Sequence, residues 1–301
     1  MSTITKVALA GARGNLGEPV LTQLLKAGFQ VTVLTREGSS GTFPSAVTVK
    51  AVNYDSVDSL TAALQGQDAL VSTITTEAVD KQRNLVEASA KAGVKRFIPS
   101  EFGSDTFNEK LEKLPGYKDK VDLHEVLAKA ARETGLTWTA VVNGPFLDWG
   151  IAVNFLLNVK DRAIEYLDGG NNPFSTTTLE SVGKAVVGVL KNPEQTKNRP
   201  VYVQDVVLTQ RQLADLVKKV VGVDGWKETV TSTEETLQQI WDELKKDQPN
   251  FFPVVMGTLK TAIWGGDAYN SRFQKLDNEL LGLKGLSPAE LEAVIAKSIP
   301  K

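Results

Sequence analysis

The stretch VALAGARGNLG, residues 7–17, constrains the fold of this chain more than any other feature. An apolar run typical of a strand meets three glycines, Gly11, Gly14 and Gly17, and a helix-like segment follows at once. In such a turn the first glycine permits the tight bend and the second lets backbone N–H groups approach a pyrophosphate, while the third lets helix and strand pack closely. The Gly-x-x-Gly-x-x-Gly spacing differs from the more common Gly-x-Gly-x-x-Gly. The stretch therefore predicts a dinucleotide site at the start of an α/β fold.

The following sequence repeats this order of strand and helix. Its apolar segments are rich in Val, Ile and Thr and lack polar alternation, as expected for strands that are buried on both faces. The expected strands span residues 6–11, 30–35, 47–52, 68–73, 96–100 and 136–142. The expected helices span residues 15–27, 56–65, 79–92 and 117–134, and the glycines that can end them are Gly28, Gly66, Gly93 and Gly135. This order predicts a Rossmann-type, doubly wound parallel sheet with helices on both faces.

The regular order ends near residue 150. Residues 162–178 are expected to form strands around a turn, 179–192 a helix, and 200–209 a strand that leads into another helix. The remainder is expected to be mostly helical, with breaks at Pro249, Pro253 and Gly265–Gly266. We predict a dinucleotide-binding domain of residues 1–150, to which 175–205 returns, and a smaller α+β substrate-binding region of residues 151–301. The smaller region is expected at the carboxyl edge of the sheet, where open α/β sheets hold ligands.

The composition excludes several classes of function. The 301 residues carry 34 basic and 36 acidic side chains, so no global basic field is available for nucleic acid. The sequence has no cysteine, which excludes disulfides and thiolate chemistry, and its one histidine, His124, argues against a histidine-rich metal site or a hydrolase triad. A signal-peptide pattern is absent, and no run approaches the ~18 apolar residues of a membrane span. We expect a soluble, cytoplasmic protein with no metal, nucleic-acid or membrane partner.

The end of the second expected strand indicates which dinucleotide is bound. NAD-binding folds place an acid there for the ribose 2′-hydroxyl, whereas an arginine accommodates a 2′-phosphate. This chain reads VTVLTRE, with Arg36 at the strand end, and Arg13 in the glycine turn can approach the same phosphate. Glu37 is the complication, because it can turn toward the ribose. The pattern favours NADP over NAD.

Further motifs carry a family resemblance. The Tyr-x-x-x-Lys pair of common short-chain dehydrogenases is missing, since none of the five tyrosines has a lysine four residues later. The stretches RFIPSEFGSD (96–105) and NGPFLDWG (143–150), with the glycine turn and LTRE, resemble the isoflavone reductase-like and NmrA-like proteins, atypical short-chain dehydrogenases/reductases. Within them, the chain is most similar to the fungal aromatic alcohol reductase branch. The resemblance is clear over residues 1–190 and looser beyond.

The resemblance implies one catalytic lysine on the helix after the Ser-Glu-Phe-Gly loop. In YKDKVDLHEVL (117–127) Lys120 fits best, with Lys118 as an alternative, while an ungapped count back from Gly135 places His124 there instead. His124 lies one helical turn after Lys120 on the same face and is a second candidate site residue. The expected cofactor contacts, from the glycine turn, the strand ends and the resemblance, are Gly11, Arg13, Gly14, Asn15, Leu16, Gly17, Arg36, Thr75, Phe102, Lys120, Asn143, Pro145 and Phe146.

These observations predict an NADPH-dependent reductase that transfers hydride to a small, aromatic substrate, with a lysine as acid or base. A desolvated lysine suits this role because burial moves the pKa of an amine toward neutrality. The alternative is an NmrA-like regulator that senses dinucleotide without turnover. A sugar epimerase is disfavoured by the missing Tyr-x-x-x-Lys pair. The chain is expected to be a monomer or a homodimer.

Overall fold

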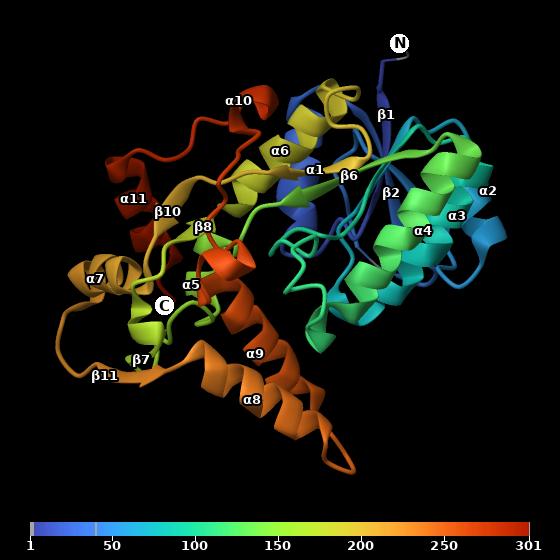
Figure 1. The fold of residues 1–301 in the computed structure, drawn as a ribbon. Helices are drawn as coiled ribbons and strands as arrows, with labels where there is room; N and C mark the ends of the chain where they lie inside the picture. Colours follow the sequence, from blue (N-terminus) through green and yellow to red (C-terminus); the bar gives the residue numbers. More distant parts are fainter. Residues whose placement is uncertain (1–2, 40, 301) are drawn as a thin grey trace.

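A parallel sheet of seven strands forms the centre of the structure (Figure 1). The computed structural model describes residues 3–39 and 41–300. The strands are β1 (Lys6–Ala10), β2 (Gln30–Arg36), β3 (Thr48–Val52), β4 (Ala69–Ser72), β5 (Arg96–Ile98), β6 (Thr137–Val142) and β9 (Arg199–Tyr202). Their order is β3-β2-β1-β4-β5-β6-β9, and each neighbouring pair is parallel. The doubly wound α/β fold expected from the sequence is confirmed.

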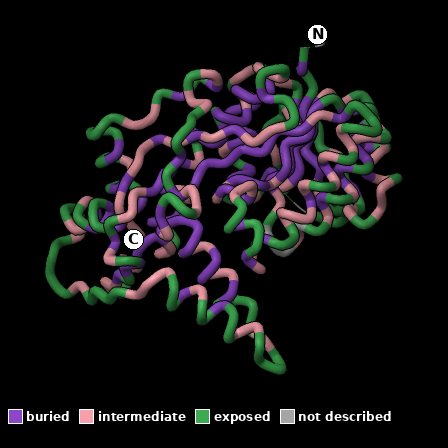
Figure 2. The backbone as a smooth tube through the Cα atoms, in the orientation of Figure 1, coloured by how far each residue is buried: buried purple, intermediate pink, exposed green. Residues whose placement is uncertain are grey.

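Helices cover both faces of this sheet. The pair α1 (Gly17–Lys26) and α6 (Leu179–Lys191) lies on one face, and α2 (Val57–Leu64), α3 (Gln82–Lys91) and α4 (Lys118–Thr134) lie on the other (Figure 1). In β1, Val7 and Leu9 pack in the core under α1 and α6, while Ala8 and Ala10 pack under the other helices. Successive side chains of a strand point to opposite faces, so both sets must be apolar. Figure 2 shows these strands as the buried centre of the molecule.

The ends of the first helices follow the sequence signals closely. The four glycines expected to end them all adopt a left-handed conformation, with φ between +75° and +83°. The first helix begins at Gly17 and not at residue 15, because residues 15 and 16 belong to the turn. A short 3-10 helix, η1 (Thr76–Lys81), precedes α3, and another, η2 (Pro115–Tyr117), precedes α4.

The rest of the chain builds a second apolar core beside the sheet. This part of the chain contains α5 (Leu147–Ala152), β7 (Ala163–Leu167), η3 (Asp168–Gly170), β8 (Phe174–Thr176), β10 (Val206–Leu208), α7 (Gln210–Val221), β11 (Lys227–Thr231), α8 (Thr233–Leu244), α9 (Phe251–Trp264), η4 (Asp267–Tyr269), α10 (Asn278–Leu281) and α11 (Pro288–Ser298). Of these, α10 packs against α6 in the core of the main sheet. β8 pairs with β10 and β7 with β11, so two small sheets form here. In Figure 1 the pair α8–α9 extends away from this core beside the loop that leads to α4. Among the described residues, no helix has the length and apolarity that a membrane crossing requires.

Two expectations for this region were wrong. Residues 200–209 form two strands, because the chain leaves the main sheet after Val203 and pairs with β8 instead. The carboxylate of Asp205 fixes the change of direction by accepting hydrogen bonds from the backbone and hydroxyl of Thr178. Pro253 does not break α9, since it lies in the first turn, where a backbone N–H has no helical partner in any case.

A buried arginine ties β5 to its neighbours. Arg96 is 2% exposed, and its guanidinium donates hydrogen bonds to the hydroxyls of Thr137, Thr139 and Thr196 and to the carbonyl of Pro193. Pro193 lies just beyond α6, where the partial negative charge of a helix end favours a cation. Burial lowers the pKa of Arg96 to about 10, which still leaves it charged at neutral pH. The side chain thereby links β5 and β6 to the segment between α6 and β9.

We expect Arg96→Met to lower the free energy of unfolding by about 2–4 kcal/mol, because the buried hydroxyls and the carbonyl lose their donor. Urea unfolding followed by circular dichroism measures this. Arg132→Met is the matched control, since Arg132 is exposed and pairs only with Glu125. Equal stability of the two variants would contradict the assigned role of Arg96.

Candidate functional site

The three glycines of the first turn have different spatial requirements. Gly11 has φ +85°, and a Cβ there would lie 2.5 Å from the carbonyl oxygen of Thr73. A Cβ on Gly17 would lie 2.0 Å from the carbonyl oxygen of Gly11, so the start of α1 rests directly on the turn. At Gly14 the nearest atom would be 3.3 Å away, which is tight but close to ordinary contact. The backbone therefore requires glycine at Gly11 and Gly17, whereas the space beside Gly14 is open toward a hollow.

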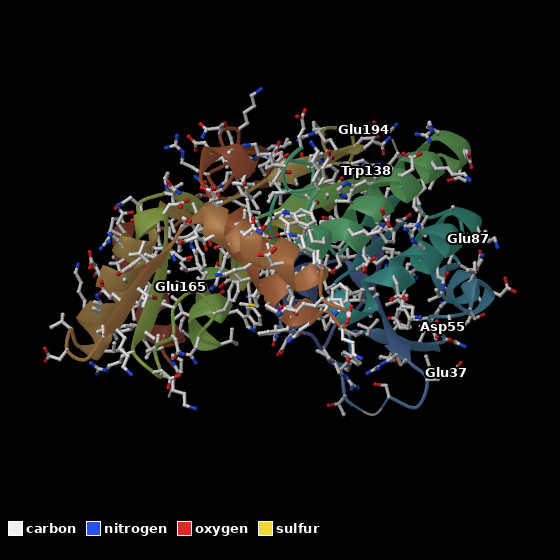
Figure 3. All side chains as sticks on the ribbon, turned by 60° about the horizontal axis from the view of Figure 1, so that its bottom comes forward. Glu37, Asp55, Glu87, Trp138, Glu165 and Glu194 are labelled. Atoms are coloured by element: carbon white, nitrogen blue, oxygen red, sulfur yellow. The ribbon has the colours of Figure 1, made fainter. Side chains whose placement is uncertain are left out.

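That hollow has a volume of about 650 Å³ and lies at the carboxyl edge of the sheet. Its wall is formed by Gly11, Arg13, Gly14, Leu34, Thr35, Arg36, Glu37, Ser39, Val52, Asn53, Tyr54, Asp55, Thr73, Ile74, Thr75, Ala78 and Lys81. The structure thus brings five of the expected cofactor contacts together, Gly11, Arg13, Gly14, Arg36 and Thr75. In Figure 3, Glu37 and Asp55 lie near each other at this end of the molecule. A smaller hollow of about 220 Å³ lies at the opposite edge, beside Arg96.

The start of α1 lies next to the glycine turn that lines this hollow. The residue before the helix is Leu16, and no side chain caps the first backbone N–H groups. By contrast, α2 and α6 are capped by Ser56 and Thr178. In the first turn of α1 the N–H of Glu18 donates to the carbonyl of Gly14, and Pro19 has no N–H. What the helix start offers an anion is therefore mainly the positive end of the helix dipole.

Two arginines stand at the wall of the hollow. The guanidinium of Arg13 lies over the ring of Phe43, 5.1 Å from its centre, and Nη1 donates to the hydroxyl of Ser39 at 3.4 Å. Arg36 is exposed at the end of β2 and lines the same hollow. Glu37 also lines it. The two arginines expected to bind a 2′-phosphate are therefore at the hollow, and so is Glu37, whose carboxylate could instead bind the ribose of NAD.

The remaining expected cofactor contacts do not line this hollow. Leu16 and Phe102 pack in the core between the sheet and α1, and Phe146 packs against that core. Asn143 is fully buried, and its Nδ2 donates to the carbonyl of Gly144. Pro145 accepts a hydrogen bond from Thr176 through its carbonyl. Asn15 and Gly17 belong to the turn and the start of α1, and Lys120 lies at a separate cavity.

Lys120 and His124 converge on one residue, Glu101. The Nζ of Lys120 donates to the backbone carbonyl of Glu101 at 2.6 Å, and the Nε2 of His124 lies 3.5 Å from its carboxylate. Burial lowers the pKa of Lys120 from the usual 10.5, while the charge of Glu101 acts in the opposite direction. Lys118, by contrast, is exposed and pairs with Asp122 at 2.7 Å. The two candidate catalytic residues are thus neighbours in space, and Lys118 lies apart from them.

A cavity of about 90 Å³ lies beside Lys120, between the start of α4 and α9. Tyr117 and Lys120 line it from one side, and Val255, Thr258 and Leu259 of α9 line it from the other. A Cβ on Gly116 would lie 2.8 Å from the hydroxyl of Thr258, so the glycine allows α9 to approach η2 closely. Burial raises the pKa of the Tyr117 phenol well above its usual value. The cavity therefore has side chains of α9 at one wall, and a lysine, the carboxylate of Asp119 and a neutral phenol at the other.

Sequence reasoning missed several residues of both sites. Glu101 was quoted only as part of the Ser-Glu-Phe-Gly motif and was given no function. An acidic residue directly after an apolar strand could have indicated a functional side chain at the carboxyl edge of the sheet. Tyr54, Asp55 and Lys81 line the hollow, and Lys81 pairs with Asp55 at 2.6 Å. No short-range pattern distinguishes these from ordinary loop residues.

Comparisons with known proteins identify relatives of this chain. The sequence model of the NmrA-like family matches residues 3–258. Oxidoreductase aprR of Aspergillus flavus is 37% identical over 97% of this chain and 99% of its own length. Oxidoreductase poxI of Penicillium oxalicum is 34% identical over 72% of this chain and 70% of its own length.

Solved structures share the fold over nearly the whole chain. The structure of AtPrR2 with NADP+ and (+)pinoresinol has a TM-score of 0.79 at 21% identity, and it covers 99% of this chain and 100% of its own. A crystal structure of isoflavone reductase has a TM-score of 0.76 at 18% identity, with the same coverage. The similarity that the sequence motifs indicated is confirmed, and the chain belongs to the NmrA-like family.

Proposed function

We propose that this protein is an NADPH-dependent reductase that transfers hydride to a small aromatic substrate, with Lys120 as the proton-transfer residue. The observation that carries the proposal is the hollow of about 650 Å³ at the carboxyl edge, which joins the glycine turn, an uncapped helix start and two arginines. The fungal relatives aprR and poxI are named oxidoreductases, which supports an enzyme of this class.

The residues of the hollow fit a dinucleotide. Gly14 lines the hollow, and a Cβ there would lie 3.3 Å from the carbonyl oxygen of Gly11, so a larger side chain would occupy space beside the turn where a pyrophosphate would meet the start of α1. Arg13 and Arg36 line the same hollow and suit a 2′-phosphate, because guanidinium groups bind phosphate oxygens in pairs. Structures of related fold contain NADP+ or NADPH, which supports this choice.

When bound, NADPH supplies the hydride, and the protein must supply position and a proton. Lys120 is half-buried and lies beside the cavity at α9, where it can exchange a proton with a carbonyl or phenol oxygen. Relatives and structural neighbours include pinoresinol-lariciresinol reductase 2 of Linum usitatissimum and isoflavone reductase, whose names refer to aromatic compounds. The apolar side chains of α9 in the cavity wall suit an aromatic ring.

The assay mixes the purified protein with NADPH and aryl aldehydes, aryl ketones or propenyl phenols and follows the nicotinamide absorbance. We expect turnover of at least one of these classes. If none is reduced and the protein instead retains a protein partner only when dinucleotide is present, a dinucleotide-sensing regulator replaces the reductase.

NADPH should bind at least about tenfold more tightly than NADH, a difference of about 1.4 kcal/mol, because of arginine–phosphate pairing. Arg36→Ala should remove most of this preference in calorimetric titrations with both cofactors. Arg83→Ala is the control, since Arg83 lies on α3 and faces Asp122. A wild-type protein with equal affinities would refute the NADP assignment.

Gly14→Val should abolish dinucleotide binding while the protein stays folded, because the added side chain fills space that the pyrophosphate needs. Gly17→Ala should instead unfold the protein or lower its melting temperature strongly, since its Cβ would collide with the carbonyl of Gly11. Calorimetric titration and thermal unfolding separate the two effects. Normal NADPH binding by the Gly14 variant would mean that this glycine serves only the turn.

Lys120→Ala should keep the affinity for NADPH within a few fold but lower turnover by ~10²-fold or more, the range for loss of a positioned acid–base group. His124→Ala should be milder, because His124 contacts Glu101 and lies one turn farther along α4. Steady-state kinetics of both variants provide the measurement. Normal turnover of the Lys120 variant with an inactive His124 variant would transfer the catalytic role to His124.

A further inference from the structure

Glu101 is a buried carboxylate beside the residue that we propose to transfer the proton, so this inference rests on the proposed function. Its side chain is 1% exposed, although it directly follows the apolar strand β5 and its short extension. An ionised carboxylate in such a place needs compensation by hydrogen bonds or positive charge. The described residues show which groups provide it.

Two side chains hold the Glu101 carboxylate in place. The hydroxyl of Thr106 donates to Oε2 at 2.6 Å, and His124 Nε2 lies 3.5 Å from Oε1. The His124 ring is itself fixed, because it stacks on Phe107 with 4.0 Å between ring centres and Phe107 stacks on Trp138. Trp138, labelled in Figure 3, lies beside α4 in that view. The orientation of the carboxylate is therefore set by the loop, by α4 and by β6.

The same residue also binds Lys120 through its backbone. Lys120 Nζ donates to the Glu101 carbonyl at 2.6 Å, so any movement of Glu101 moves the lysine's acceptor. The ionisable groups near Lys120 are Glu101 from the loop, Tyr117 from η2, and Asp119 and His124 from α4. Of the elements packed against it, α9 adds only uncharged side chains to the cavity wall. Asp119 is exposed to solvent, so Glu101 is the buried negative charge among these groups.

We propose that Glu101 is a positioning residue for the reaction: it holds the carbonyl that binds Lys120 and supplies the negative charge that balances the ammonium beside the cavity at α9. Burial raises the pKa of Glu101, but the contacts with His124, Lys120 and Thr106 outweigh this effect and keep its pKa below the usual value. Glu101 is therefore ionised at neutral pH. Its charge opposes the lowering of the Lys120 pKa by burial.

Burial and the charge of Glu101 shift the pKa of Lys120 in opposite directions, and this determines the effect of removing the charge. Without the negative charge, burial acts alone on Lys120, and the pKa of the amine falls further. The pH at which Lys120 loses its proton then moves down. A reaction that needs the protonated lysine loses activity at lower pH than in the wild type, and one that needs the neutral amine gains it at lower pH. The direction is the same for an acid and a base.

The experiment compares wild type with Glu101→Gln, which removes the charge at nearly constant volume. The pH dependence of kcat should shift downward by about one pH unit or more. Competitive acetylation of Lys120 by acetic anhydride over a pH series, followed by peptide mass spectrometry, should give the same shift without any need for turnover. Glu125→Gln is the matched control, because Glu125 is an exposed carboxylate on the same helix that pairs with Arg132. It should shift neither profile.

Thr106→Val provides a second variant if Glu101→Gln fails to fold. It keeps the carboxylate but removes the 2.6 Å hydrogen bond, so a smaller shift in the same direction is expected. Identical Lys120 labelling profiles in wild type and the folded variant would overturn the inference even if the protein is an active reductase. A shifted labelling profile in a protein without reductase activity would uphold the role of Glu101 toward Lys120 and reject the proposed function instead.

Discussion

The approach of α1 to the end of β1 is the constraint on which the rest of the structure depends. A Cβ on Gly17 would lie 2.0 Å from the carbonyl oxygen of Gly11, so the helix starts against the backbone it has just left. This contact sets α1 on the sheet, and α6 packs along α1 to complete one face of the core. It also places the start of α1 next to the glycine turn that lines the hollow. A single steric requirement therefore serves both the core and the proposed pyrophosphate site.

Local patterns were sufficient for the first half of the fold and insufficient for the second. Strands such as β1 are apolar on both faces, and the helices between them end at glycines in the left-handed conformation, so each boundary has a cause within a few residues. The break between β9 and β10 has a distant cause, the carboxylate of Asp205, which accepts hydrogen bonds from Thr178. The tolerance of Pro253 depends on where α9 begins, and that in turn depends on the cap at Asn250. The Asp205–Thr178 contact spans 27 residues and cannot be read from neighbouring sequence, whereas Asn250 is a local signal that the sequence-based prediction did not use.

The same distinction applies to the candidate site. Arg13 and Arg36 were expected together because they follow strand ends at one edge of a parallel sheet, and Thr75 was expected from the family resemblance. The structure places all three in one hollow. The surroundings of Lys120 depend instead on the irregular loop between β5 and α4 and on α9, which joins the site from far along the chain. Periodicity gives no information on such a loop. The environment of Lys120 is therefore set by segments that are distant in sequence, and local patterns do not predict it.

The two ends of β5 carry buried charges with different roles, a structural one for Arg96 and the proposed positioning role for Glu101. Arg96, at the amino end, makes four hydrogen bonds to uncharged acceptors that belong to the surrounding strands and turns. Glu101, beyond the carboxyl end, has one oxygen bound by Thr106, while Oε1 has no hydrogen-bond partner among the described residues. A charge held by several donors or acceptors of the framework cannot respond to a ligand without disturbing the fold. A charge with an incomplete set of partners beside a lysine can respond, because a proton or a substrate group changes its balance at low structural cost. The carboxyl edge therefore combines a rigid sheet with one carboxylate, that of Glu101, whose interactions can change during proton transfer, as an acid–base site requires.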